Sequence, residues 1–308
     1  MLENMASVAN QVLILFMIIA TGFVLTKFKL LNKERVAGMI DLVVYVVTPA
    51  NIVVSFQREY KSELMSRLLL SLFLAFVVFF FNCLIARSIF YKSDRNKNCV
   101  IEFASAFPNA GYFGLPLQQA ILGDIGVFFG AAYIAMFHCY IWTYGIRILS
   151  PQKEKINIKK ILLNPPIIGI IVGMILFLCR ISLPEVVLSP LTSFSHMNTT
   201  LPMLIIGFYL ANTDVKATFT NGRIYIGAVL RLVVSPVLAM VLCIVMHVDT
   251  TVAVSCIIAC SAPSAAMSGM LAMKYGRDTS VSAGMISLTT TLCIVTMPVL
   301  IALAQTLL

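Results

Sequence analysis

The chain has 308 residues, of which 60% are hydrophobic and only 11% are charged, with a mean hydropathy of +0.96. Soluble globular domains carry about 25% charged residues, so this composition excludes a soluble protein and indicates one that crosses a membrane several times. The net charge of +9 does not indicate nucleic-acid binding, because the positive residues lie in short loops between apolar segments.

Ten apolar segments are long enough to cross about 30 Å of hydrocarbon. These predicted spans are 4–26, 35–56, 66–90, 99–121, 126–149, 164–181, 197–213, 223–246, 251–273 and 280–305. The first lacks the preceding basic region of a secretory signal, so we expect it to stay in the protein. The longest polar interval is too short for an independent domain, and we predict one membrane domain over residues 1–308.

The lysines and arginines between these spans are distributed unevenly. Seventeen of the 22 follow odd-numbered spans, whereas Arg58, Lys61, Arg67 and Arg180 follow even-numbered ones. Cytoplasmic loops of membrane proteins carry the excess of positive residues. The count therefore predicts a multi-pass protein of the cell membrane, inner or plasma, with both termini on the extracellular or periplasmic side and membrane lipid around it.

The prolines indicate an internal repeat. Pro49 and Pro202 lie 153 residues apart in the second and seventh spans, and Pro108 and Pro263 lie 155 residues apart in the fourth and ninth. Similarity at a fixed offset is typical of repeated architectures.

Each repeat contains five spans, over about 1–150 and about 160–308. Because five is odd, the second copy enters the membrane from the opposite face, and the repeat is inverted. The sequence thus predicts an all-α membrane protein of ten transmembrane helices in two inverted five-helix repeats, with broken, crossing helices 4 and 9.

The two breaks form the candidate substrate site. Proline removes a backbone donor and clashes with the carbonyl four residues earlier, and irregular backbone survives in hydrocarbon only when it is buried or lines a cavity. The helix that begins after each break offers unpaired N–H groups, which favour anions. We therefore predict that a small carboxylate binds here; the alternative is a pair of structural kinks. The site residues expected at the two breaks are Pro108, Asn109, Ala110, Gly111, Pro263 and Ser264.

These motifs resemble the auxin efflux carrier family of bacterial permeases and plant auxin exporters. The fourth span is similar to the family's P-N-x4-G-[LI]-P-L from Pro108 to Leu117, and the ninth to its A-P-x8-A-x-x-Y from Ala262 to Tyr275. Arg231 precedes Pro236 as in the R-x4-P of plant members. His138, Cys139 and Trp142 stand where plant members have Q-C-x-x-W.

The resemblance implies a scaffold of helices 1, 2, 6 and 7, a transport domain of the other six, and a homodimer. It also implies that Asn109 holds a carboxylate and that His138 occupies the place of a substrate-contacting glutamine. Since His138 is not glutamine and the connection between helices 5 and 6 is short, the bacterial branch, similar to malate, malonate and lactate permeases, is the closer comparison.

Five further polar residues lie within predicted spans, where such residues are functional candidates. His138 either relays a proton and binds a carboxylate or is a packed histidine, and Asn51 either contacts substrate or joins two helices. Asp41 and Glu102 lie about one turn from the cytoplasmic end, where solvation is easy, and are candidates for coupling or gating. Arg231 either attracts the anion, holds an acidic partner or extends to the cytoplasmic surface.

The leading functional hypothesis is a secondary transporter that moves a small organic anion, a mono- or dicarboxylate, by alternating access at the crossing of helices 4 and 9, without a cofactor. A sodium-coupled bile-acid-type symporter and a passive anion channel or sensor of the same fold remain alternatives. The sequence lacks the common motifs of membrane enzymes, and its eight cysteines lack metal-ligand spacing, so we expect neither an enzyme nor a metal site. Gly169 and Gly173 predict close helix packing or a dimer face.

Overall fold

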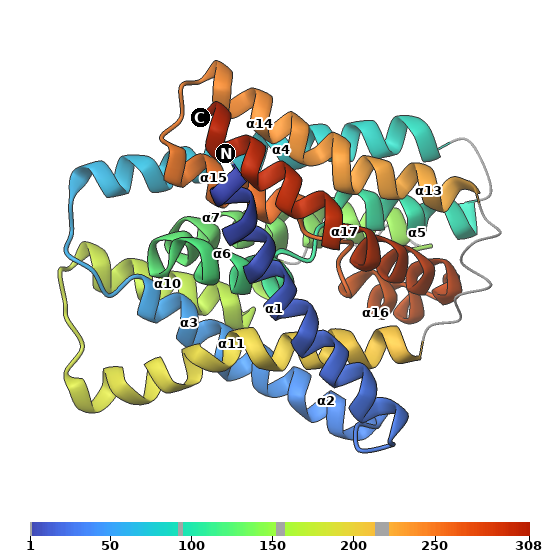
Figure 1. The fold of residues 1–308 in the computed structure, drawn as a ribbon, viewed down its shortest axis with the longest axis horizontal. Helices are drawn as coiled ribbons and strands as arrows, with labels where there is room; N and C mark the ends of the chain where they lie inside the picture. Colours follow the sequence, from blue (N-terminus) through green and yellow to red (C-terminus); the bar gives the residue numbers. More distant parts are fainter. Residues whose placement is uncertain (1, 92–94, 152–157, 213–221) are drawn as a thin grey trace.

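The computed structural model describes residues 2–91, 95–151, 158–212 and 222–308. Over these ranges the chain is helical, and the one β pairing is an isolated antiparallel bridge between Pro108 and Ser264. Figure 1 shows helices packed side by side, most of them running lengthwise through the molecule. The all-helical class predicted from the sequence is confirmed.

The first half of the chain contains helices that are interrupted at several prolines. Its elements are α1 (Leu2–Lys27), α2 (Lys33–Leu42), the π-helical turn η1 (Val43–Val47), α3 (Thr48–Ser55), α4 (Ser62–Phe90), α5 (Arg95–Ala106), η2 (Ala110–Gly114), α6 (Leu115–Leu122), α7 (Asp124–Tyr140), η3 (Ile141–Gly145) and α8 (Ile146–Leu149).

The described part of the second half is also helical. Its elements are α9 (Ile158–Leu162), α10 (Pro165–Leu178), α11 (Glu185–Ala211), α13 (Gly222–Val229), η4 (Leu230–Val234), α14 (Ser235–Val245), α15 (Thr250–Ser261), α16 (Met267–Lys274) and α17 (Thr279–Leu307). In the described ranges, six helices have the length and hydropathy of membrane spans, and α10 and α15 are shorter apolar helices.

Helical segments occupy all ten ranges predicted as spans, but one boundary was wrong. The seventh range was predicted to begin at residue 197, whereas α11 begins at Glu185 and continues through Pro190. Its first turns carry serine, histidine and threonine residues that lower the local hydropathy, so a search for apolar segments misses them.

In the described residues, three of the four π-helical turns end two residues before a proline. Pro49, Pro116 and Pro236 each lie at the second position of the α-helix that follows η1, η2 and η4. Proline cannot donate to the carbonyl four residues earlier and its ring clashes with it, so a wider turn accommodates the ring without ending the helix.

We call α1 to α3 with η1, α10 and α11 the first helix group; close backbone contacts join these helices, while α1 also packs on α17 and α3 on α7. In this group α1 packs along α11, and α3 packs against α10 and α11. Gly22 and Gly207 allow the approach of α1 to α11, because a Cβ at either position would collide with the backbone of the other helix. Gly169 and Gly173 of α10 likewise face Pro49 and Phe56 of α3. The prediction of close packing at these two glycines is confirmed, and their contacts lie within the chain.

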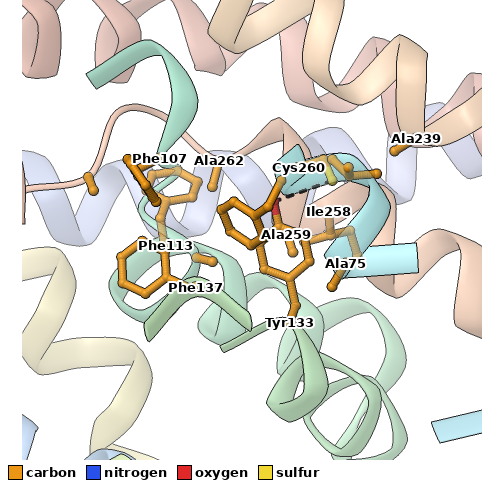
Figure 2. Close-up of a cluster of buried hydrophobic side chains, with 14 of the residues drawn as sticks. Ala75, Phe107, Phe113, Tyr133, Phe137, Ala239, Ile258, Ala259, Cys260 and Ala262 are labelled. Atoms are coloured by element: carbon orange, nitrogen blue, oxygen red, sulfur yellow. Dashed lines mark hydrogen bonds between the residues drawn. The ribbon is translucent and has the colours of Figure 1, made fainter. Parts of the chain in front are cut away.

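The second group contains α4 to α8 and α13 to α17, with α15 packed against α7, α14 and α17. Figure 2 shows Phe107, Phe113 and Phe137 gathered beside Ala262, close to the break in the ninth span. Tyr133 points toward Cys260, whose Sγ lies 3.5 Å from the tyrosine oxygen. The buried aromatic core of this group thus surrounds the two chain breaks.

Candidate functional site

The two chain breaks meet and pair through their backbones. The N–H of Asn109 donates to the carbonyl of Pro263 at 2.6 Å, and the N–H of Ala265 donates to the carbonyl of Phe107 at 3.0 Å. These bonds place Pro108 opposite Ser264 in the antiparallel bridge. We call residues 107–109 and 263–265 the crossover.

The backbone amides next to the two prolines are therefore hydrogen-bonded, and the free amides lie a few residues later in each of the two segments. Besides the two bridge bonds, the N–H of Ser264 donates to Oγ1 of Thr289 at 3.0 Å. In the described part of the chain, five amides that open the helices after the breaks have no acceptor. They belong to Ala110, Gly111, Tyr112, Ala266 and Met267. Two helix N-termini with unpaired donors thus adjoin the crossover, as expected for an anion site.

A pocket with a volume of about 90 Å³ lies beside the crossover. This volume holds several waters or one small solute, since a single water needs about 10–15 Å³ by the same measure. The lining residues are Val44, Thr48, Asn109, Gly111, Tyr112, Ile134, Phe137, His138, Asn164, Pro166, Ala265, Ala266, Met267 and Met270. They come from η1, α3 and residues 164–166 at the start of α10 in the first helix group, and from the crossover, η2, α7 and residues 266–270 at the start of α16 in the second. The pocket therefore lies on the seam between the two groups.

Unpaired polar side chains line this pocket. The side chain of Asn109 makes no hydrogen bond within the described residues, although its backbone N–H and carbonyl are both bonded. Nδ1 of His138 and Oδ1 of Asn164 are buried and have no partner there either. Buried polar groups are nearly always hydrogen-bonded in folded proteins. Their presence beside a pocket therefore indicates that a solute or water completes them.

The structure brings together some of the residues expected at the breaks and separates others. Asn109, Gly111 and His138 line the pocket, whereas Pro108 and Pro263 belong to the crossover. Ala110 contributes a free amide, as stated above. Ser264 is fully buried, and its hydroxyl points to no partner in the described chain and lies outside the pocket lining.

Asn51 and Asp41 are not among the residues that line the pocket. Oδ1 of Asn51 accepts a hydrogen bond from Oγ of Ser195 at 2.7 Å, which joins α3 to α11. Asp41 is exposed on α2. Among the alternatives left open by the sequence, the contact of Asn51 matches a residue that joins two helices.

Glu102 differs from expectation in its solvation. Its position near the end of a span predicted easy access to water, but its side chain is 0% exposed. One carboxylate oxygen accepts a hydrogen bond from the hydroxyl of Tyr144 at 2.9 Å and lies 3.8 Å from the guanidinium of Arg87. The prediction failed because neighbouring helices cover the end of α5, which hydropathy along one segment does not reveal.

Arg231 is completely buried, so it does not extend to the cytoplasmic surface. Its guanidinium donates to the carbonyls of Ser105 and Ala106 at the end of α5, to the carbonyl of Cys260 near the end of α15, and to Oγ of Ser235. The last carbonyls of a helix carry partial negative charge and lack partners within the helix. Arg231 thus binds the C-terminal ends of both helices that stop at the crossover.

Sequence reasoning missed several pocket residues. Thr48 lies just before Pro49, and Asn164 lies just before Pro165, the first residue of α10. Oγ1 of Thr48 also contacts Oδ1 of Asn198 at 3.3 Å. A polar residue beside a proline in the second or sixth predicted span is a weak signal, because nothing in the local sequence indicates that it faces the crossover.

The comparison with known families decides the class. Residues 7–301 match the family described as membrane transport protein. The chain belongs to this family. It is the auxin efflux carrier family that the motifs of the fourth and ninth spans indicated. Membership identifies a multi-pass membrane protein of a transporter family, and not of an enzyme family.

A relative of similar length supports the same class. The chain is 26% identical over 300 residues to an uncharacterized transporter of Methanocaldococcus jannaschii, and the match covers 92% of this chain and 94% of the relative. The match therefore spans most of both chains.

The hydrogen bonds of Arg231 predict that the fold around the crossover is less stable without this side chain. Arg231→Met should lower the free energy of unfolding by about 2–4 kcal/mol, because buried carbonyls at two helix ends lose their donors. Thermal unfolding of the purified protein in detergent measures the change, and Arg147→Met, at an exposed position on α8, is the matched control. Equal stability of the two variants would contradict the assigned role.

Proposed function

We propose that the protein is a secondary transporter that moves a small organic anion, a mono- or dicarboxylate, by alternating access at the crossover. The observation that carries the proposal is the pocket where two helix N-termini, with free amides, and the unpaired carboxamide of Asn109 converge. No cofactor takes part in this mechanism.

The charges around the pocket favour an anion. Its lining contains no lysine, arginine, aspartate or glutamate. A cationic solute would find no carboxylate there, whereas each helix N-terminus contributes about half a positive charge and direct N–H donors. A carboxylate held by several amides needs no positive side chain, and a neutral site releases its solute more easily than an ion pair does.

The apolar part of the lining suggests the form of the substrate. Ile134, Phe137 and Met270 offer hydrocarbon surface beside the donors. His138 and Asn164 are placed to hydrogen-bond a second polar group, such as the other carboxylate of a diacid or a hydroxyl. A short carbon chain with one or two acidic ends therefore fits the lining.

The arrangement of helices supports ten spans in two inverted repeats, about 1–150 and about 160–308. The first span packs against the seventh, which is the contact of α1 with α11. In the second repeat the sixth span corresponds to the first, and it packs against the second span, which is the contact of α10 with α3. The antiparallel pairing of the two breaks has the same symmetry. We infer a scaffold of α1, α2, α3, α10 and α11 and a moving domain of the rest, and we adopt the homodimer implied by the family resemblance.

Asn109 provides the main test. Asn109→Ala should lower the affinity for the transported carboxylate about tenfold or more, because a hydrogen bond to a charged group contributes about 1.5–3 kcal/mol. A thermal-shift screen of small mono- and dicarboxylates on the purified protein identifies the ligand, and titration of both forms gives the affinities.

The control is Asn10→Ala, at an exposed position on α1. It should bind the carboxylate as the unaltered protein does. Equal affinity in Asn109→Ala, with folding intact, would remove the site assignment.

Sodium coupling is the closest alternative, and the contacts of Arg231 argue against it. In broken-helix transporters, half-helix C-termini and freed carbonyls can coordinate sodium. Here the guanidinium of Arg231 already occupies such carbonyls, those of Ser105, Ala106 and Cys260.

Uptake into vesicles should therefore change less than about twofold when external sodium is replaced by potassium at constant potential. A large sodium dependence would instead support a bile-acid-type symporter. Saturation of uptake with substrate, together with exchange against internal substrate, would separate the transporter from a passive channel or a sensor.

The loop charges support an orientation with both termini outside the cytoplasm. A C-terminal alkaline phosphatase fusion, which is active only outside the cytoplasm, should therefore be active in bacterial cells. An inactive phosphatase fusion, together with bright fluorescence from a C-terminal green fluorescent protein, would contradict this orientation and place the C-terminus in the cytoplasm.

A further inference from the structure

A second pocket lies away from the crossover, between two loops of the first helix group. It has a volume of about 390 Å³ and lies between residues 57–60, after α3, and residues 180–183, before α11. Both loops run along the left edge of Figure 1, at one end of the molecule. None of the residues that line it lines the pocket at the crossover.

Two arginines and one carboxylate, that of Glu59, line its walls, and neither arginine is paired with a carboxylate in the described part of the chain. Arg58 and Arg180 form no ion pair among the described residues, and Asp124, which attracts Arg58, lies beyond ion-pair distance. The other two positive residues of these predicted outer loops are paired, Lys61 with Glu59 and Arg67 with both Glu63 and Asp249. The two unpaired cations therefore share one pocket.

Aromatic rings fix both guanidiniums in place. The Cζ atom of Arg58 lies 4.8 Å from the ring centroid of Phe128, and that of Arg180 lies 5.1 Å from that of Tyr60. Tyr60 and Phe128 both pack on Phe177, at centroid distances of 5.2 Å and 5.4 Å. Nε of Arg58 also donates to the carbonyl of Ser55 at 2.7 Å. Stacked arginines lose little side-chain entropy when they bind a ligand.

Gln57 adds a donor to the same pocket. Its Oε1 accepts the N–H of Leu183 at 2.8 Å, which ties the two loops together. Its Nε2 is buried and has no partner in the described chain. An unpaired buried donor beside two unpaired guanidiniums favours a ligand that has only acceptors.

We propose that Arg58, Arg180 and Gln57 form a second anion-binding site, which takes a single oxyanion such as a carboxylate or phosphate group. Guanidinium groups bind these planar or tetrahedral oxyanions through paired hydrogen bonds. The ligand comes either from solution or from the phosphate of an acidic lipid headgroup. The site does not depend on the proposed transport function, because its residues are separate from those at the crossover.

Binding of inorganic phosphate to the purified, lipid-depleted protein in detergent tests the site. Equilibrium dialysis with radioactive phosphate, at constant ionic strength, should detect one site. In the double variant Arg58→Gln, Arg180→Gln the affinity should fall at least about tenfold, since each lost charge-assisted bond contributes about 1.5–3 kcal/mol. Lys33→Gln, which removes one positive charge at an exposed position on α2, should change it less than twofold.

Arg180→Gln alone covers the case in which the double variant fails to fold, because the side chain of Arg180 is exposed and donates to no backbone carbonyl among the described residues. It should also weaken binding. Absence of phosphate binding, or equal binding in Arg180→Gln and Lys33→Gln, would overturn the proposal.

Nanodiscs distinguish the two sources of the anion. If phosphate binds to the protein in phosphatidylcholine but not in phosphatidylglycerol, an acidic headgroup occupies the site. If it binds equally well in both, the site takes a soluble anion. If Arg180→Gln leaves phosphate binding unchanged in both lipids, the proposed site does not exist in the membrane-embedded protein.

Discussion

The structure depends on how the backbone is satisfied where two helices stop inside an apolar protein. Each break frees carbonyls on one side and amides on the other, and unsatisfied groups in hydrocarbon cost several kcal/mol each. The crossover solves part of this by pairing one break with the other, through the bonds of Asn109 to Pro263 and of Ala265 to Phe107. Arg231 binds the freed carbonyls of α5 and α15. Among the backbone groups left without a partner in the described residues are the five amides at the helix starts, and four of them belong to residues that line the pocket.

This division of partners gives the crossover its electrostatic character. A cation at the C-terminal ends neutralises the negative ends of α5 and α15, whereas the positive N-terminal ends that follow the breaks have no counter-charge in the pocket lining. The site is thus neutral in side chains and positive in potential. In the proposed transport cycle, such a site would hold an anion without a fixed ion pair, which favours its release. The position of the pocket between the two helix groups suits this cycle, because relative motion of the groups would change which side it faces.

Much of this architecture could be predicted from the sequence, because it depends on features within single segments. Apolar length gave all ten helical ranges, and Pro108 and Pro263 gave the positions of both breaks. The start of α11 was misplaced because its first turns are polar yet helical. The burial of Glu102 and the contacts of Arg231 were not predictable, since they depend on which neighbours cover a helix. Thr48 and Asn164 were missed for the same reason: they reach the pocket from helices far away in the sequence.

An experimental structure of the protein in lipid nanodiscs with saturating malonate would test the central claim most directly. The account predicts density for a carboxylate within hydrogen-bond distance of the Asn109 side chain and of the amides of Gly111 or Ala266, with both helices interrupted at the crossover. Continuous fourth and ninth helices, or malonate bound elsewhere while the crossover pocket holds only water, would contradict it.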